Sequence, residues 1–174
     1  MGATCIALGI VLPFFLHPFG LSPRVFLPMH FPIFLAGMLL TPAMAAAVGA
    51  LTPELSMGFT GMPSADQTLR MIPELITYAV ATSIILRAIP KWPFVSEKMG
   101  RIAALITAML VAMVAGRFVY VLMSAWMIGL QSPHYYLLLL VIPALPGIVA
   151  QLVLMPPLAY RVQQVIYRSE SGSS

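Results

Sequence analysis

The run MGRIAALITAMLVAMVAGRFVYVLMSAWMIGL, residues 99–130, decides the fold class of this chain. Only Arg101 and Arg117 carry a charge in it, and most other positions hold Ala, Leu, Val, Ile or Met. A bilayer core about 30 Å thick is crossed by roughly 20 apolar helical residues. The run is therefore long enough to predict a transmembrane helix.

Composition extends this prediction to the whole chain. Of its 174 residues, 60% are hydrophobic and only 8% are charged, whereas soluble domains carry about 25% charged residues. The net charge of +4 does not indicate a nucleic-acid partner, because most basic residues flank apolar runs. We expect an all-α integral membrane protein with a single domain, residues 1–174, that forms a six-transmembrane-helix bundle. The predicted spans are residues 3–16, 30–40, 42–60, 69–88, 99–130 and 135–168.

The distribution of Lys and Arg predicts the orientation of the bundle. Basic residues concentrate on the cytoplasmic side of membrane proteins. With six spans, six of the nine Lys and Arg residues fall on one side, which places both termini in the cytoplasm: Arg87, Lys91, Lys98, Arg101, Arg161 and Arg168.

Four ionisable residues lie within or at the edge of apolar runs: His30, Glu54, Glu74 and Arg117. A charge at membrane depth costs roughly 2.5–3.5 kcal/mol on insertion scales, so such residues usually face the bundle interior or a polar cavity. A helical rise of about 1.5 Å per residue places them, together with Gln151, in the outer half of the bundle. This grouping predicts a solute pocket near the extracellular face.

A structural interpretation of the same residues remains open. The two glutamates could serve only as partners of Arg117 that stabilise the bundle, and His30 could serve only to anchor the start of its helix. His17 and His134 are expected in loops, and the three histidines show no metal-ligand spacing. Since Cys5 is the only cysteine, no disulfide framework or thiolate metal site is expected, and no cofactor is predicted.

Proline and methionine add detail to the predicted pocket. Helix-breaking prolines interrupt the last predicted helix on both sides of Gln151, and the backbone groups that they free need partners in the protein or a wet cavity. Flexible thioether side chains suit adaptable binding surfaces. Met29 and Met62 are expected near the outer cavity and could line it.

Several stretches of the chain resemble the substrate-binding S components of energy-coupling factor (ECF) transporters, and the resemblance covers nearly the whole chain. The stretches are residues 28–37 (PMHFPIFLAG), 51–53 (LTP), 60–63 (TGMP), 74–78 (ELITY), 116–120 (GRFVY) and 146–151 (PGIVAQ).

The resemblance implies six helices, an outward-facing pocket for a vitamin or similar micronutrient, and no catalytic activity in this chain. It also implies docking to a transmembrane T component and two cytoplasmic ATPase subunits. In the family an Ala-xxx-Ala pattern on the first helix contacts the T component, and Ala3 and Ala7 match this pattern.

Within such a pocket each polar residue has an expected role. Glu54 and Glu74 would accept hydrogen bonds from an amine or hydroxyl, and Arg117 would bind an anionic edge or hold a glutamate in place. His30 and Gln151 would supply neutral hydrogen bonds, and Tyr78 a stacking face. Two carboxylates against one guanidinium favour a cationic or zwitterionic heterocycle.

Two other function classes remain as alternatives. A stand-alone proton-coupled carrier would accumulate its solute without ATPase partners, and internal inverted repeats would favour it, but none is evident in the sequence. A small intramembrane enzyme would need a nucleophile–base pair or a metal set, and neither pattern is evident.

Overall fold

The computed structural model describes residues 1–16, 27–89, 97–129, 135 and 142–171. Three residues with sequence-based predictions lie outside these ranges: Lys91, His17 and His134. The described residues form helices and no strand, which confirms the predicted all-α class for this part of the chain. The helices are α1 (Gly2–Leu16), α3 (His30–Leu39), α4 (Pro42–Thr60), α5 (Ala65–Ala88), α6 (Glu97–Ile128) and α8 (Leu145–Ser171).

Three of the described helices are long and apolar enough to cross a membrane. The candidate spans are Ala65–Ala88 in α5, Lys98–Ile128 in α6 and Leu145–Val165 in α8. Two shorter apolar helices, α1 and α3, accompany them. The ten residues of α3 extend about 15 Å, roughly half the thickness of a hydrocarbon core. The lengths and composition of these helices indicate a membrane protein.

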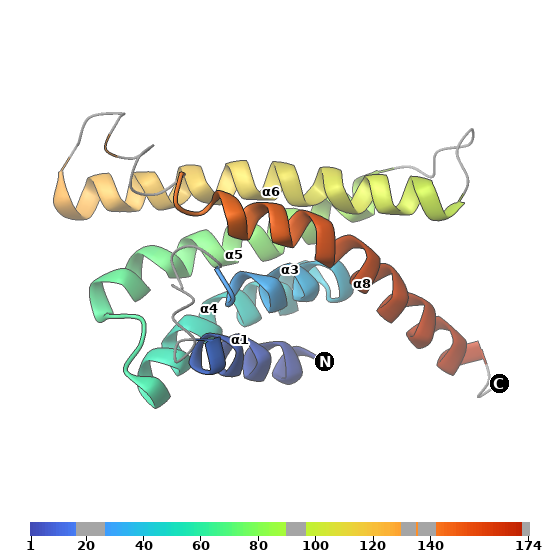
Figure 1. Cartoon of the computed structure of the whole chain (residues 1–174), viewed down its shortest axis with the longest axis horizontal. Coiled ribbons are helices and arrows are strands. Elements are labelled where there is room, and N and C mark those ends of the chain that lie inside the picture. The colour runs from blue at the N-terminus through green and yellow to red at the C-terminus, as the bar shows by residue number, and fades with distance from the viewer. Residues whose placement is uncertain (17–26, 90–96, 130–134, 136–141, 172–174) are drawn as a thin grey trace.

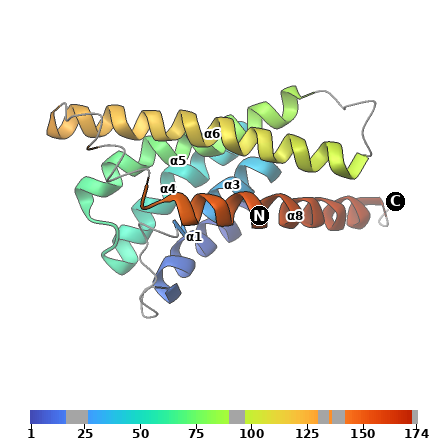
Figure 2. The ribbon, with the colours of Figure 1, turned by 45° about the horizontal axis from the view of Figure 1, so that its top comes forward.

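The helices pack around the short helix α3. Long α6 runs along one side of the molecule, α5 lies against it, and α4 and α1 follow on the other side (Figure 1). The last helix, α8, contacts both α3 and α6, and its end extends beyond the bundle toward the C-terminus (Figures 1 and 2). Most of α3 is buried, including Ile33, Phe34 and Ala36. The core of the described structure is therefore centred on α3.

Small residues allow the helices to approach closely. A Cβ atom added at Gly49 of α4 would lie 2.8 Å from the backbone oxygen of Leu75 and 2.9 Å from Cα of Ile76 in α5. A Cβ atom at Gly116 of α6 would lie 2.4 Å from the ring of Tyr78. Glycine at helix crossings permits this close backbone contact in membrane bundles. These two crossings hold α4, α5 and α6 together.

Two helix starts differ from the sequence-based expectation. Helix α5 begins at Ala65, one turn earlier than residue 69, and its first turn contains Asp66, whose negative charge is favourable at a helix N-terminus. Helix α8 begins at Leu145, and residues 142–144 form a turn. The predicted span over 135–168 is therefore interrupted at 142–144, where Pro143 is one of the prolines expected to break it. Pro143 disfavours a helical residue before it, whereas Pro146 lies in the first turn, where proline is tolerated.

Polar side chains satisfy the carbonyl groups at the C-terminal end of α3. The oxygen of Leu40 accepts hydrogen bonds from Arg87 Nη2 at 2.9 Å and Ser83 Oγ at 2.8 Å. The oxygen of Met38 accepts one from Gln163 Nε2 at 3.1 Å. These carbonyls lack helical partners because the chain breaks before Pro42. Side chains from α5 and α8 therefore cap α3 at this end of the bundle.

Candidate ligand cavity

A cavity of about 820 Å³ lies at the end of the bundle where α4 ends and α5 begins. This volume falls within the range of small-molecule sites, about 300–1,000 Å³. Its walls come from α1, α3, α4, α5, α6 and the residues that precede α3 and α8. The lining residues are Ile10, Pro13, Phe14, Leu27, Pro28, Met29, His30, Ser56, Thr60, Gly61, Met62, Pro63, Ser64, Asp66, Gln67, Arg70, Met71, Glu74, Arg117, Tyr120, Tyr135 and Ala144.

An ion pair between α5 and α6 forms part of the cavity wall. Arg117 Nη1 lies 3.2 Å from Glu74 Oε1, and the Tyr78 hydroxyl donates a hydrogen bond to the same oxygen at 2.7 Å. Glu74 is only 1% exposed. Charge-assisted hydrogen bonds of this kind are roughly twice as strong as neutral ones. The pair places two opposite charges beside the cavity without leaving either of them isolated.

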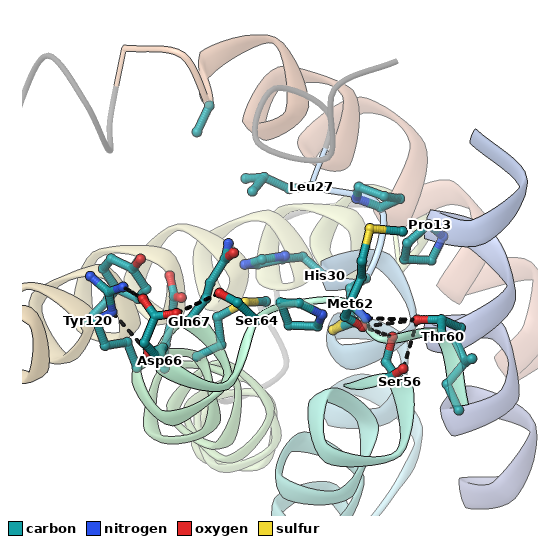
Figure 3. Close-up of a pocket in the computed structure, with 18 of the residues that line it drawn as sticks. Pro13, Leu27, His30, Ser56, Thr60, Met62, Ser64, Asp66, Gln67 and Tyr120 are labelled. Atoms are coloured by element: carbon teal, nitrogen blue, oxygen red, sulfur yellow. Dashed lines mark hydrogen bonds and ion pairs between the residues drawn. The ribbon is translucent and has the colours of Figure 1, made fainter. Parts of the chain in front are cut away.

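His30, the first residue of α3, lies beside this ion pair. In Figure 3 its imidazole lies between the group of Ser56, Thr60 and Met62 and the group that includes Asp66. The imidazole is buried, and neither of its ring nitrogens has a hydrogen-bond partner. Its ring centroid lies 5.3 Å from that of Tyr78. His30 thus packs as an aromatic ring while its polar atoms remain unsatisfied.

A second ion pair lies near the start of α5. Asp66 pairs with Arg70 and also accepts a hydrogen bond from Ser64 Oγ at 2.6 Å. Residues four apart share a helix face, so Asp66, Arg70 and Glu74 follow one another along the side of α5 that lines the cavity. The cavity wall therefore carries two ion pairs: the deeper Glu74–Arg117 pair and the outer Asp66–Arg70 pair.

Hydrogen bonds fix the chain segment between α4 and α5. The oxygen of Met62 accepts hydrogen bonds from Ser56 Oγ at 2.8 Å and Thr60 Oγ1 at 3.1 Å. The amide of Met62 donates to Thr60 Oγ1 at 3.2 Å. This segment forms a defined part of the cavity rim (Figure 3).

Five of the eight residues expected in the binding site line this one cavity: Met29, His30, Met62, Glu74 and Arg117. Two others lie behind the wall. Tyr78 is buried and holds Glu74, and it stacks with His30 and Phe34. Gln151 is 1% exposed and donates to the Leu27 oxygen at 3.4 Å. We therefore assign Tyr78 and Gln151 to supporting positions, in place of direct contact with a ligand.

Glu54 does not join the other acidic and basic residues. Its side chain is exposed on α4 and is not part of the cavity wall. The buried face of α4 carries Thr52, Pro53 and Ser56, and two residues along a helix correspond to a rotation of about 200°. The expected position of Glu54 beside Glu74 and Arg117 is thus corrected, because the residue faces away from the bundle.

Several polar residues of the wall were not expected from the sequence, among them Ser56, Thr60, Ser64, Asp66, Gln67, Arg70 and Tyr120. The expected start of the fourth helix at residue 69 assigned Asp66 to a loop. The four-residue spacing of Asp66, Arg70, Glu74 and Tyr78 is the signal that could have placed them on one helix face.

The polar groups of the wall suit an organic molecule with hydrogen-bonding groups. Within the described residues, no three His, Cys, Asp or Glu side chains come together as a metal site. No protein-family model, curated protein or solved structure matches the chain. The cavity is consequently the main observation that bears on function.

Proposed function

We propose that this chain is the substrate-specificity (S) component of an ECF transporter, and that it binds a vitamin or related micronutrient from the extracellular side. One observation carries the proposal: a cavity of ligand size in an apolar helical protein, with the Glu74–Arg117 pair and His30 in its wall. Ionisable residues at membrane depth mark solute sites when they face a cavity. The resemblance of residues 28–37 and 74–78 to this family supports the assignment.

The distribution of charge supports the proposed orientation. The cavity lies near the junction of α4 and α5, whereas the end of α5 and the start of α6 lie at the opposite end of the molecule (Figure 1). That opposite end carries Arg87, Lys98 and Arg101. By the positive-inside rule the basic end is cytoplasmic. The proposal therefore includes six spans in a prokaryotic plasma membrane, cytoplasmic termini and an outward-facing cavity.

Transport would require partner proteins, as in the family that the chain resembles. We propose a transmembrane T component and two cytoplasmic ATPase subunits. Ala3 and Ala7 are exposed on α1, and their four-residue spacing places them on one face, where small side chains permit close helix contact. This accessibility is consistent with docking through α1.

The first test is the identity of any molecule that co-purifies with the protein. The full chain is purified in mild detergent from cells grown in rich medium, and its small-molecule content is measured by mass spectrometry. We expect one water-soluble organic nutrient at up to one equivalent, and its loss from the Glu74→Gln variant. A protein that carries no such molecule and binds none of the common vitamins would contradict the proposal.

A second test separates an S component from a stand-alone carrier. The protein is reconstituted alone in vesicles that contain an ion gradient but no ATPase. We expect binding without accumulation of the co-purified nutrient. Accumulation driven by a proton gradient alone would favour the carrier, and chemical conversion of the nutrient would favour an enzyme.

A further inference from the structure

We infer that the molecule held in this cavity carries no net charge. The His30 imidazole recognises a neutral hydrogen-bonding group on the ring of this molecule. This inference rests on the proposed function, because it describes the nutrient that the cavity would take. It follows from the charges around the cavity, the unsatisfied atoms of His30 and the nature of the wall.

The charged side chains in the described wall form two pairs of opposite sign. Glu74 pairs with Arg117, and Asp66 pairs with Arg70. A charged ligand would therefore find no unpaired opposite charge in the described wall, and burying an unpaired charge is strongly unfavourable. The sequence-based preference for a cationic or zwitterionic heterocycle depended on a second carboxylate, Glu54, which faces away from the cavity.

His30 provides polar atoms that are available to hydrogen-bond a ligand, whereas the charged groups of the two ion pairs are bound to each other. Both of its ring nitrogens are buried without a hydrogen-bond partner, and leaving a buried polar atom unsatisfied destabilises a protein. A neutral imidazole offers one donor and one acceptor. A ligand with a neutral donor or acceptor, such as a hydroxyl, carboxamide or ring nitrogen, would satisfy one of these atoms.

The rest of the described wall includes aromatic and thioether side chains, against which a flat ring would pack. Phe14 and Tyr120 contribute aromatic surface, and Met29 and Met71 contribute thioether side chains. Since both ring nitrogens of His30 are buried, a ligand must move a neighbouring side chain to reach them. Unbranched methionine side chains can rearrange in this way with little strain.

The charge inference is tested with two matched series of probes. Each series keeps one ring and changes the net charge through one substituent. The first is nicotinamide (neutral), nicotinate (anionic) and 1-methylnicotinamide (cationic), and the second is pyridoxine (neutral), 4-pyridoxate (anionic) and pyridoxamine (cationic). Binding to the purified full chain is followed by thermal shift and native mass spectrometry. We expect a neutral member to bind at least about tenfold more tightly than the charged members of its series. A charged member that binds as tightly, or no binding of either neutral compound at millimolar concentration, would overturn the inference.

Arg117→Met provides a complementary test, because it leaves Glu74 without its cation. The preference of this variant is expected to move toward pyridoxamine, the cationic member. An unchanged preference would mean that the ion pair does not set the charge selectivity.

The role of His30 is tested with His30→Phe, which keeps the ring but removes both nitrogens. We expect at least a tenfold loss of pyridoxine affinity, while the melting temperature of the empty protein stays equal or rises. Thr82→Val is the matched control, because it also removes a buried polar atom without a hydrogen-bond partner, the Thr82 hydroxyl oxygen, but from a residue outside the cavity wall. The affinity of the Thr82→Val variant for pyridoxine should be unchanged. If His30→Phe does not fold, His30→Leu serves instead because it also lacks a hydrogen-bonding group, and wild-type affinity in either folded variant would overturn the role of His30.

The two proposals fail in different ways. A charged nutrient that co-purifies with the protein would overturn the present inference and leave the S-component proposal supported. The absence of any bound nutrient, together with no binding of the common vitamins, would overturn the S-component proposal itself.

Discussion

Glu74 has its position fixed by two neighbours from two helices. Tyr78 donates to it from one turn further along α5, and Arg117 reaches it from α6. Gly116, next to Arg117, makes this possible because it allows α6 to pass close to Tyr78. The arrangement leaves a carboxylate in the cavity wall with its charge balanced before any ligand arrives.

The substitution Glu74→Gln should weaken ligand binding at least about tenfold and lower the free energy of unfolding by roughly 1–3 kcal/mol. It removes the charge that balances Arg117 while keeping the shape of the side chain. Affinity can be measured by isothermal titration with the co-purified nutrient, and stability by thermal unfolding in detergent.

The same substitution at Glu54 is the control for this prediction. Glu54 is exposed and outside the cavity, so Glu54→Gln should leave affinity unchanged and stability within about 0.5 kcal/mol. A loss of binding in Glu54→Gln as large as that in Glu74→Gln would contradict the arrangement described for α4 and α5.

Glu74, Arg117 and His30 could be identified from the sequence because an ionisable residue in an apolar run is costly at membrane depth and usually faces the bundle interior or a cavity. The sequence could not show which way Glu54 faces. In α4 the side chains that face the bundle include Thr52 and Ser56, so polarity alone does not mark the outer face of this helix. The direction of Glu54 depends on how α4 packs, and that packing depends on residues far away in the sequence.

At the level of the helices, the crossing of α4 and α5 depends on glycine. Gly49→Ala should lower stability by about 1–3 kcal/mol, because its Cβ atom would meet the backbone of Leu75 and Ile76, which cannot move aside as a side chain can. Thermal unfolding in detergent measures the effect.

Gly58→Ala on the same helix is the control. A Cβ atom there would meet nothing within 4 Å, and alanine favours a helix over glycine by about 0.5–1 kcal/mol. This variant should be equally or more stable than the original protein. Equal loss of stability at both positions would argue against close packing of α4 and α5.

The C-terminal end of α3 depends on side chains from other helices. Arg87→Leu removes one of the two side-chain donors to the Leu40 oxygen, while Ser83 still donates to it. It should destabilise the protein by about 1 kcal/mol, the net contribution of a typical hydrogen bond. Arg161→Leu changes an exposed arginine and should alter stability by no more than about 0.5 kcal/mol. Similar midpoints of unfolding for the two variants would show that Arg87 does not cap α3.

Apolar runs were sufficient to predict that these segments are helical, but they could not place every helix end. Helix α4 begins at Pro42 and ends at Thr60, as its proline and the following glycine suggest. The first turn of α5 is polar and was therefore assigned to a loop. Helix ends of this kind depend on charge at the helix N-terminus more than on hydrophobicity.

For the molecule as a whole, the cavity and the basic residues define two opposite ends. In a Cys5→Ala background, a cysteine introduced by Ala65→Cys should react with a membrane-impermeant maleimide in intact cells. A cysteine introduced by Arg161→Cys should react only after the cells are opened. Both positions are exposed, so the comparison reports sidedness. The reverse labelling pattern would place the cavity on the cytoplasmic side.

Helix α8 is tied to α3 near both ends of that shorter helix. Gln151 binds the Leu27 oxygen, just before α3 begins, and Gln163 binds the Met38 oxygen near its end. These two amides lie about three turns apart on α8, with Pro156 and Pro157 between them. A tilt imposed on the protruding end of α8 would consequently pull on Leu27, itself a wall residue. The C-terminal half of α8 is thus connected, through hydrogen bonds to the residues at both ends of α3, with the wall of the cavity.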